Sequence, residues 1–262
     1  MDAVTWIELE GAVNARDVGG LPTTDGRKVA YRRLLRSDNL QDLTENDIKV
    51  LVGTHGLRTV VDLRTDFERA SEGPGPLRAD GRVRHADLSV LPEAGDNTDV
   101  AAEALAARRR ERNRARYPAN FMTGLYLGYL EDRAENVVQA VREIAYTDGA
   151  ALVHCAAGKD RTGTVVALTL SAVGVEPEAV VQDYARTAER IELVLDRLRT
   201  TPTYAHDIDR LPVDAHTPRG ETMEAFLDHL DRHYGGAAGW LARHGFGDGE
   251  LERLYRRLVD GA

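Results

Sequence analysis

The feature that most constrains this chain is a short apolar segment, residues 150–154, which runs into a glycine-containing loop and then into a helix-forming segment. The ten residues from His154 to Gly163 read HCAAGKDRTG. An apolar run of this length that ends in such a loop is typical of a buried strand. A strand, a tight loop and a helix in this order direct backbone N–H groups inward, and the helix N-terminus adds positive potential. The segment therefore predicts an anion-binding site.

Strands and helices alternate along the rest of the chain, which predicts an α/β fold with a central, mostly parallel sheet flanked by helices. Besides 150–154, strands are predicted at 4–10, 28–36, 58–64 and 82–88. Helices are predicted at 44–55, 100–116, 120–146, 162–173, 177–198, 221–233 and 249–259, the first with a capping box of Thr44 and Asp47. We expect a single domain over residues 1–262, in which residues 92–130 form a helical insertion and a candidate lid.

Charge and hydropathy limit the kinds of molecule that this protein is expected to bind. The formal net charge is −9, and an acidic protein is a poor non-specific binder of nucleic acid or of anionic membranes. We therefore expect no nucleic-acid partner, and we expect any anionic substrate to bind at a local site. No segment is long and apolar enough for a membrane span, and the first residues do not resemble a signal peptide. We expect a cytoplasmic protein, with non-classical secretion left open and the oligomeric state undetermined.

Cys155 is the only cysteine, so an intramolecular disulfide is excluded. Taken alone, a single cysteine is more often a buried apolar residue than a reactive one. Here it is followed by a loop with Gly158, then by Arg161 and Thr162. Thiols that face a nest of amides at a helix N-terminus ionise more readily than free thiols. We therefore interpret Cys155 as a nucleophile that attacks a phosphate ester.

The neighbours of Cys155 have complementary chemistry. The planar fork of Arg161 suits two phosphoryl oxygens. The hydroxyl of Thr162 suits a hydrogen bond to the sulfur, and His154 suits support of Cys155 from behind. The predicted phosphate-binding residues are Ala156, Ala157, Gly158, Lys159, Asp160 and Arg161.

The run HCAAGKDRTG resembles the Cys-x5-Arg-Thr/Ser signature of the protein tyrosine phosphatase superfamily. Its form is similar to that of the atypical bacterial tyrosine and lipid phosphatases. Supporting matches to that family lie at 14–20, 35–40, 61–68, 183–184 and 235–241. The resemblance implies a protein tyrosine phosphatase-like fold and a two-step reaction through a phosphocysteine, with no metal and no cofactor.

A general acid must protonate the leaving oxygen. Many members of the superfamily carry it in a Trp-Pro-Asp run, which this chain lacks. Asp160 is the first choice, because the pattern resembles that of the atypical members. Asp62, at the end of a predicted strand, and Asp96 are the alternatives. For Asp62, a structural ion pair with Arg64 is the favoured interpretation.

Other charged residues leave two interpretations open. In similar proteins, a lysine at the position of Lys159 goes with acceptance of phosphoinositides, and the alternative is a solvated lysine. The basic run of 108–116 is either part of the lid or, as we favour, a solvated helix face with Glu111 as partner. His229 and His233 have a spacing that suits zinc, but no acidic pattern accompanies them. The other histidines, His206, His216 and His244 among them, show no metal-binding spacing.

The leading hypothesis is a metal-independent phosphomonoesterase that acts on phosphotyrosine, phosphoserine and phosphothreonine proteins and on phosphoinositides. One alternative is a small-molecule phosphatase for sugar, inositol or biosynthetic phosphates, with the same loop chemistry. A second is a sulfurtransferase that resembles rhodanese, against which Arg161 and Thr162 argue. A third is a pseudophosphatase that binds phosphate without turnover, against which the presence of both Cys155 and Arg161 argues.

Overall fold

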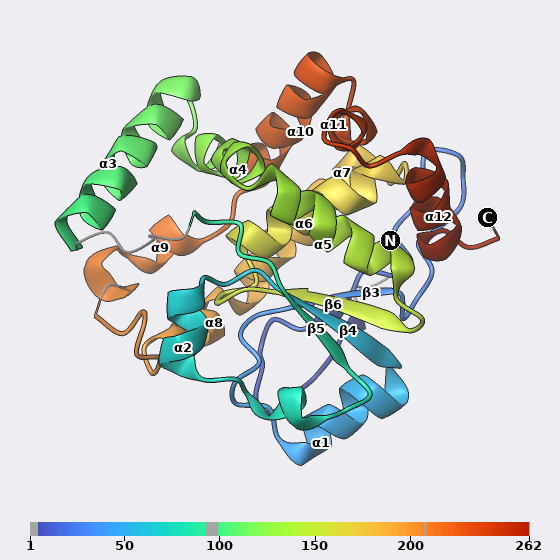
Figure 1. Ribbon diagram of the computed structural model, residues 1–262, viewed down its shortest axis with the longest axis horizontal. Coiled ribbons are helices and arrows are strands. Elements are labelled where there is room, and N and C mark those ends of the chain that lie inside the picture. The colour runs from blue at the N-terminus through green and yellow to red at the C-terminus, as the bar shows by residue number, and fades with distance from the viewer. Residues whose placement is uncertain (1–4, 93–98, 207, 262) are drawn as a thin grey trace.

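The computed structural model describes residues 5–92, 99–206 and 208–261, without the side chains of 99–107. Within these residues the strands form one mixed sheet in the order β1-β2-β3-β6-β4-β5 (Figure 1). The strands β3, β6, β4 and β5 run parallel, and β1 and β2 add an antiparallel edge. Their bounds are β1 Thr5–Trp6, β2 Arg16–Asp17, β3 Leu34–Ser37, β4 Leu57–Asp62, β5 Arg84–Asp87 and β6 Ala150–His154. The predicted α/β fold with a mostly parallel sheet flanked by helices is thereby confirmed.

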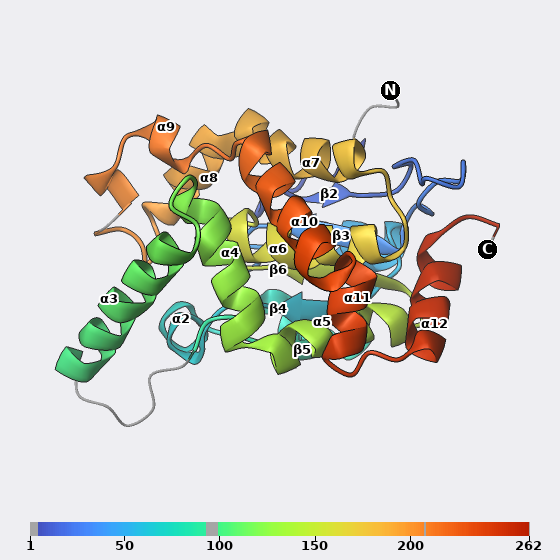
Figure 2. The ribbon, with the colours of Figure 1, turned by 90° about the horizontal axis from the view of Figure 1, so that it is seen from above.

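Helices cover the sheet unequally (Figures 1 and 2). One face carries most of them: α4 Phe121–Asp132, α5 Ala134–Tyr146, α6 Asp160–Ala172, α7 Pro177–Ala185, α10 Gly220–Tyr234, α11 Ala237–Arg243 and α12 Asp248–Leu258. On the opposite face lies α1 Glu45–Ile48, which continues as a π-helical segment, Lys49–Thr54. The remaining helices are α2 Asp66–Glu72, α3 Asp99–Arg116, α8 Ile191–Leu198 and α9 Val213–His216, with short 3-10 turns at Pro76–Ala79, Arg186–Arg190 and Ile208–Arg210.

The central strand β6 is buried on both faces, which is why its sequence is continuously apolar. Ala151 and Val153 pack into the large core beneath the main helical layer. Ala150 and Leu152 point to the other face and join a smaller core. This two-sided burial places the C-terminal end of β6 in the middle of the molecule, between β3 and β4.

Several predicted elements differ in extent. The predicted helix 120–146 is two helices, because Arg133 leaves helical geometry with φ −140° and ψ 40° while the apolar pattern continues across the break. The predicted helix 177–198 is interrupted by the 3-10 turn Arg186–Arg190. The predicted strands 4–10 and 28–36 shrink to Thr5–Trp6 and Leu34–Ser37. The short helices α2, α9 and α11 were not predicted, since each is too short for a periodic pattern. The predicted capping box of Thr44 and Asp47 is confirmed.

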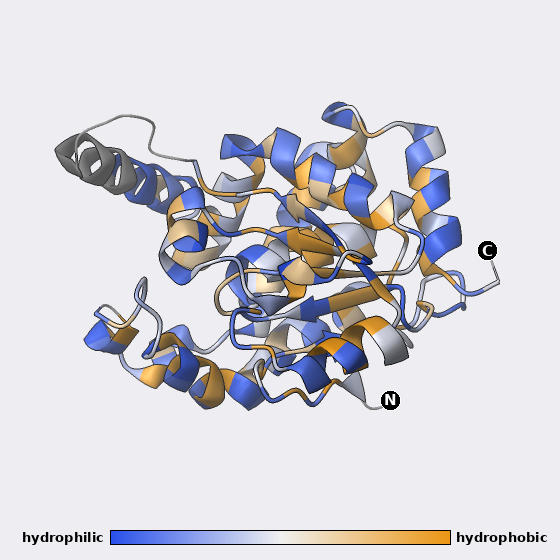
Figure 3. Cartoon of the chain, turned by 60° about the horizontal axis from the view of Figure 1, so that its bottom comes forward, coloured by the Kyte–Doolittle hydropathy of each residue, from blue (hydrophilic) through white to orange (hydrophobic). Residues whose placement is uncertain are grey.

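The predicted insertion contains two helices of different character. Helix α4 lies in the helical layer and buries Tyr126, Leu127 and Leu130. Helix α3 projects from the body of the molecule, and its described part is hydrophilic (Figures 2 and 3). Among the described residues, no helix is both long and apolar enough to cross a membrane.

Candidate active site

The loop from Cys155 to Lys159 links the C-terminal end of β6 to the first turn of α6 (Figure 1). Helix α6 begins at Asp160, two residues earlier than predicted, so Asp160 and Arg161 are already helical. Gly158 has φ +66°, and a Cβ there would lie 2.5 Å from the carbonyl oxygen of Ser37. Only glycine therefore fits this turn.

The loop is held from behind by residues of the N-terminal segment. Asn14 Nδ2 donates to the carbonyl of Ala157 at 3.0 Å, and Arg36 Nη2 donates to the carbonyl of Gly158 at 2.9 Å. The carboxylate of Asp183 pairs with both Arg36 and Arg16, whose Nε lies 2.8 Å from it. Burial raises the pKa of Asp183, but the charges of Arg16 and Arg36 outweigh burial and lower it overall. A ring of loop amides can face inward only if the loop carbonyls point outward, and these hydrogen bonds hold two of the carbonyls there.

Cys155 and Arg161 line the same cavity, which has a volume of about 350 Å³. Cys155 is only 2% exposed and also touches the large core, but this cavity gives it access to solvent. Another part of the lining is apolar and comes mainly from α8. Its residues are Leu91, Tyr129, Ile191, Val194, Leu195, Leu198 and Ile208. The cavity can thus hold an anion at the loop and an apolar group beside it.

The guanidinium of Arg161 is clamped by an acidic partner that was not predicted as a site residue. Glu68 of α2 accepts two hydrogen bonds from it, at 2.7 and 2.8 Å. Tyr204 contacts both groups: its hydroxyl accepts from Arg161 Nη2 at 3.0 Å and donates to Glu68. Burial raises the pKa of Glu68, but the charge of Arg161 and these hydrogen bonds lower it to about 2. The orientation of Arg161 is therefore set from the side of α2.

The carboxylate of Asp160 faces two buried tyrosines. The hydroxyl of Tyr126 on α4 donates to Asp160 Oδ1 at 2.5 Å and lies 2.7 Å from the hydroxyl of Tyr184 on α7. Lys159 Nζ lies 3.5 Å from Asp160 Oδ2 and donates to the carbonyl of His216 at 2.6 Å. Lys159 is largely buried, so it is not a freely solvated lysine. Both Asp160 and Lys159 line the cavity.

Asp62 and His154 lie behind the loop. Asp62 forms a buried ion pair with Arg64, whose Nη2 lies 2.7 Å from Asp62 Oδ2, in agreement with the favoured interpretation. His154 Nε2 lies 3.6 Å from the same carboxylate, and its Nδ1 lies 3.3 Å from the carbonyl oxygen of Cys155. Burial lowers the pKa of His154 to about 4, against the opposing effect of Asp62. The imidazole is therefore neutral near pH 7, so any support it gives Cys155 acts through the backbone and not through a positive charge.

The remaining predicted residues are placed as follows. Thr162 Oγ1 is buried with no hydrogen-bond partner among the described residues, so its predicted bond to the sulfur is absent in this structure. Asp96 lies outside the described residues. His229 and His233 contact each other ring to ring, with centroids 4.2 Å apart. The described part of the chain contains no group of three or more histidine, cysteine, aspartate or glutamate residues that could hold a metal ion.

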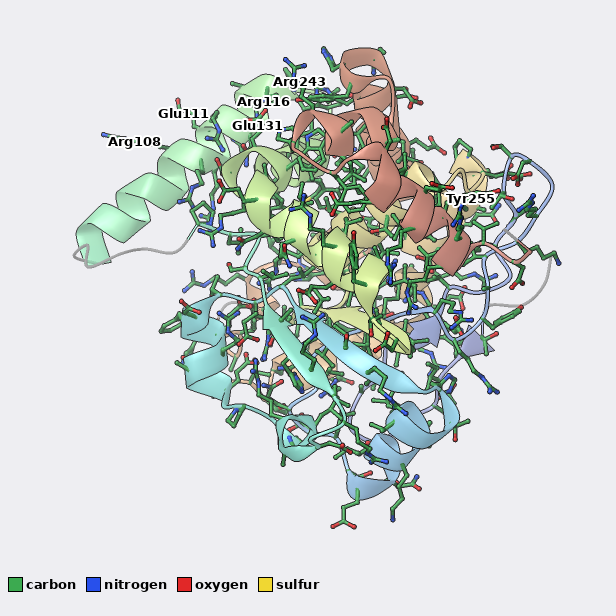
Figure 4. The ribbon with its side chains drawn as sticks, turned by 45° about the vertical axis from the view of Figure 1, so that its right-hand side comes forward. Arg108, Glu111, Arg116, Glu131, Arg243 and Tyr255 are labelled. Atoms are coloured by element: carbon green, nitrogen blue, oxygen red, sulfur yellow. The ribbon has the colours of Figure 1, made fainter. Side chains whose placement is uncertain are left out.

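The basic run of α3 is paired differently from the prediction. Arg112 and Arg109 lie 2.8 and 3.8 Å from Asp132 of α4, and Arg116 lies 2.5 Å from Glu131. The predicted partner Glu111 is exposed and makes none of these pairs. Figure 4 shows Arg108 pointing away from the body of the molecule, with Arg116 and Glu131 on neighbouring helices. Helices α3 and α4 are thus joined by several ion pairs.

Three residues around the cavity were not predicted as site residues: Glu68, Tyr126 and Tyr204. They come from α2, α4 and the segment after α8, far from Cys155 along the chain. The one signal that could have identified Glu68 was its place in the segment 61–68, which matches the resembled family. Nothing in the local sequence of Tyr126 or Tyr204 distinguishes them from core tyrosines.

Comparison with known proteins gives concordant matches over nearly the whole chain. A model of the tyrosine phosphatase family matches residues 7–260. The triple specificity protein phosphatase PtpB of Mycobacterium tuberculosis is 29% identical over 94% of this chain and 96% of its own length. A tyrosine-protein phosphatase of Nostoc commune is also 29% identical, over 86% of this chain and 73% of its own length.

Proposed function

The chain belongs to the tyrosine phosphatase family, whose members hydrolyse phosphoric monoesters, and from that premise we propose that Cys155 is its nucleophile. The observation that carries the proposal is the meeting of Cys155 and Arg161 in one cavity, at the junction of a buried strand and a helix N-terminus. The helix N-terminus and the loop amides favour an anion there. In the first step the sulfur attacks phosphorus, the bond to the ester oxygen breaks, and Asp160 gives that oxygen its proton.

In the second step water hydrolyses the phosphocysteine. The carboxylate of Asp160 accepts a proton from the water, the water oxygen bonds to phosphorus, and the sulfur leaves as thiolate. Arg161 binds the equatorial phosphoryl oxygens in both steps, where charge spreads over all three. Thr162, whose hydroxyl is buried without a partner among the described residues, donates to the departing thiolate. His154 and Asp62 support the loop from behind.

For the substrate we propose phosphotyrosine in proteins first, with phosphoserine, phosphothreonine and phosphoinositides as further substrates. The apolar wall formed by Ile191, Val194 and Leu195 suits the ring of a phosphotyrosine better than a sugar. The relative from Mycobacterium tuberculosis is described as a triple specificity protein phosphatase. Lys159 supports a phosphoinositide headgroup, since it adds a second cation to the cavity beside Arg161.

The single domain over 1–262 and the lid role of 92–130 stay proposals. The single sheet, which takes strands from Thr5 to His154, supports the single domain. The position of α3, which stands out from the body, supports the lid (Figure 2). Helix α4 itself is anchored by buried residues. We therefore place any lid movement in α3 and not in α4.

The nucleophile is tested by Cys155→Ser. We expect turnover of p-nitrophenyl phosphate to fall on the order of a thousandfold or more, as for other covalent catalysts that lose their nucleophile. Binding of inorganic phosphate, followed by calorimetry, should persist. Retained turnover in Cys155→Ser would show that Cys155 is not the nucleophile. A panel of phosphopeptides, phosphoinositides and sugar phosphates then separates the protein phosphatase from the small-molecule alternative, and thiosulfate with cyanide tests sulfurtransfer.

A further inference from the structure

A second cavity lies at the opposite end of the central strands from Cys155. It has a volume of about 520 Å³, and its walls come from the end of α5, the residue before β3 and helix α12. The catalytic loop leaves the C-terminal end of β6, whereas this cavity lies where β3 and β6 begin. Figure 1 shows α12 at the far end of the sheet from α2 and α8. The two cavities therefore do not share residues or an opening.

The lining of this cavity is strongly cationic in a protein of net charge −9. It contains one carboxylate, Glu252, and four guanidinium groups, from Arg33, Arg253, Arg256 and Arg257. Glu252 pairs with Arg256. The other three arginines have no carboxylate partner with which they form an ion pair among the described residues. We call this feature the arginine cavity.

Neutral groups hold two of these arginines in place. The guanidinium of Arg253 lies over the ring of Tyr146, 4.5 Å from its centroid, and its Nε donates to the carbonyl of Ala145 at 3.2 Å. Arg257 donates to the carbonyl of Gly149. Such contacts fix the position of a guanidinium without compensating its charge. The fold thus positions Arg253 and Arg257 without an ion pair to either of them among the described residues.

Arg257 has a hydrogen-bond donor that is not satisfied within the described structure. Its Nε is buried and has no hydrogen-bond partner among the described residues. Burial, together with the charges of Arg33 and Arg253, lowers the pKa of Arg257 to about 10, although Asp148 opposes the shift. A buried donor without an acceptor is costly, so the groups around Arg257 leave its guanidinium only partly satisfied.

We propose that the arginine cavity binds a soluble small molecule that carries two or more phosphate groups, and that it binds this molecule without hydrolysing it. Guanidinium forks match phosphate oxygens bidentately. The cavity is larger than the catalytic one, and its cations lie on separate segments, which suits several phosphate groups and not one. Its lining contains neither cysteine nor histidine, so no nucleophile of the catalytic type is present. A concave site in an acidic protein favours a small ligand over an anionic membrane surface.

Inositol hexakisphosphate serves as the probe, and calorimetry measures its affinity for the full chain. The test variant is Arg33→Gln with Arg253→Gln, both exposed positions. The matched control is Arg232→Gln with Arg243→Gln, which removes the same charge from exposed positions, one of them also over a tyrosine ring. We expect the test variant to bind at least about tenfold more weakly, because each charge-assisted hydrogen bond contributes that order of affinity. The control should bind like the wild type, and all three proteins should hydrolyse p-nitrophenyl phosphate equally.

A third protein, Arg161→Met, separates the arginine cavity from the catalytic one. We expect it to keep the part of the probe binding that the test variant loses, because that part depends on Arg33 and Arg253 and not on Arg161. Loss of binding in Arg161→Met with full binding in the test variant would assign the probe to the catalytic cavity and overturn the proposal. Equal affinity of the test and control variants would overturn it as well. Arginine-dependent binding of vesicles with phosphoinositides, or of an RNA oligonucleotide, without binding of the soluble probe would also refute it. Arg256→Gln, at another exposed position, gives an independent variant if Arg253→Gln fails to fold.

Discussion

At the residue scale, the groups around Cys155 divide into those that carry charge in the cavity and those that hold other groups in place. Arg161 and Lys159 bring positive charge to the cavity, and Glu68 and Tyr204 orient Arg161. Neutral His154 lies behind the loop. A buried guanidinium with two carboxylate bonds has little freedom, so its orientation is set before substrate binds. Because both of its Nη atoms already donate to Glu68, a phosphoryl group competes with Glu68 and Tyr204 for these donors.

The proposed proton donor Asp160 is held by Tyr126, and this contact predicts a leaving-group effect. In Tyr126→Phe the 2.5 Å hydrogen bond to Asp160 Oδ1 is lost. We expect turnover of alkyl phosphates and phosphoserine peptides to fall about tenfold, and turnover of p-nitrophenyl phosphate to fall less, because a good leaving group needs little protonation. Asp160→Asn should show the same trend with larger losses.

The control for this experiment is Tyr129→Phe, which removes a tyrosine hydroxyl from the same helix; Tyr129 lines the cavity but makes no hydrogen bond to Asp160 among the described residues. It should change both classes of substrate equally. If Tyr126→Phe also slows good and poor leaving groups alike, Tyr126 does not act through Asp160. Steady-state kinetics on a series of aryl and alkyl phosphates measures the difference.

His154 predicts a dependence of stability on pH. Its pKa is lowered by burial to about 4, so between pH 6.5 and 4 the unfolded chain binds a proton at this residue that the folded chain does not. The free energy of unfolding should therefore fall as the pH falls through this window, with a contribution from His154 of up to about 1.4 kcal/mol per pH unit. In His154→Gln this contribution should be absent. Urea unfolding at several pH values measures it.

His55 provides the comparison for that experiment, because burial lowers its pKa as well and the charges that act on it are those of Asp17 and Arg32, away from His154. His55→Gln should remove its own, separate contribution and leave that of His154. A slope in His154→Gln equal to that of the wild type would show that the imidazole is not kept neutral by the fold.

At the element scale, the contact between α3 and α4 depends on two glycines one turn apart. A Cβ at Gly124 would lie 2.2 Å from the carbonyl oxygen of Asn113, and a Cβ at Gly128 would lie 2.7 Å from its side-chain amide. The helices therefore approach as closely as backbone allows, and Asn113 is buried in the contact. The ion pairs of Arg112 and Arg116 with α4 add to this contact from the surface.

Gly124→Ala should separate these helices, because the obstacle is backbone and cannot rotate away. We expect amide hydrogen exchange in residues 108–116 to become at least about tenfold faster, with a small loss of overall stability, since α3 stands outside the main core. Gly128→Ala should have a weaker effect, because it meets a side chain. Gly53→Ala, where a Cβ would meet nothing within 4 Å, is the control and should leave α3 unchanged. Unchanged exchange in Gly124→Ala would mean that this contact does not hold α3.

At the scale of the whole molecule, one sheet separates two cationic cavities in an acidic protein. The catalytic cavity lies where the parallel strands end, and the arginine cavity lies where they begin. In parallel sheets ligands bind at the carboxyl ends of the strands, which agrees with the position of Cys155. Because the net charge of the protein is −9, its surface as a whole does not attract anions. Each cavity must therefore attract them through its own few cations.

The sequence alone determined the strand, loop and helix around Cys155, because their signals are local: an apolar run, a glycine at the turn and helix-forming residues after it. It also determined the α/β class, from the alternation of strands and helices. The predicted helix boundaries were wrong where the apolar pattern continued across a break, as at Arg133. Short helices such as α2 and α11 were not predicted, because one or two turns carry too little periodicity to be distinguished from a loop.

The tertiary structure decided which residues act on Cys155, Asp160 and Arg161. Glu68 and Tyr204 reach Arg161 across 93 and 43 residues of chain, and Tyr126 reaches Asp160 across 34. No local pattern specifies such pairs, because their geometry follows from how whole helices pack on the sheet. The same reason explains the arginine cavity, whose cations come from residue 33 and from residues 253–257. Site residues that lie within one strand, loop and helix turn could therefore be predicted from the sequence. Contacts between segments that are distant along the chain could be identified only in the folded structure.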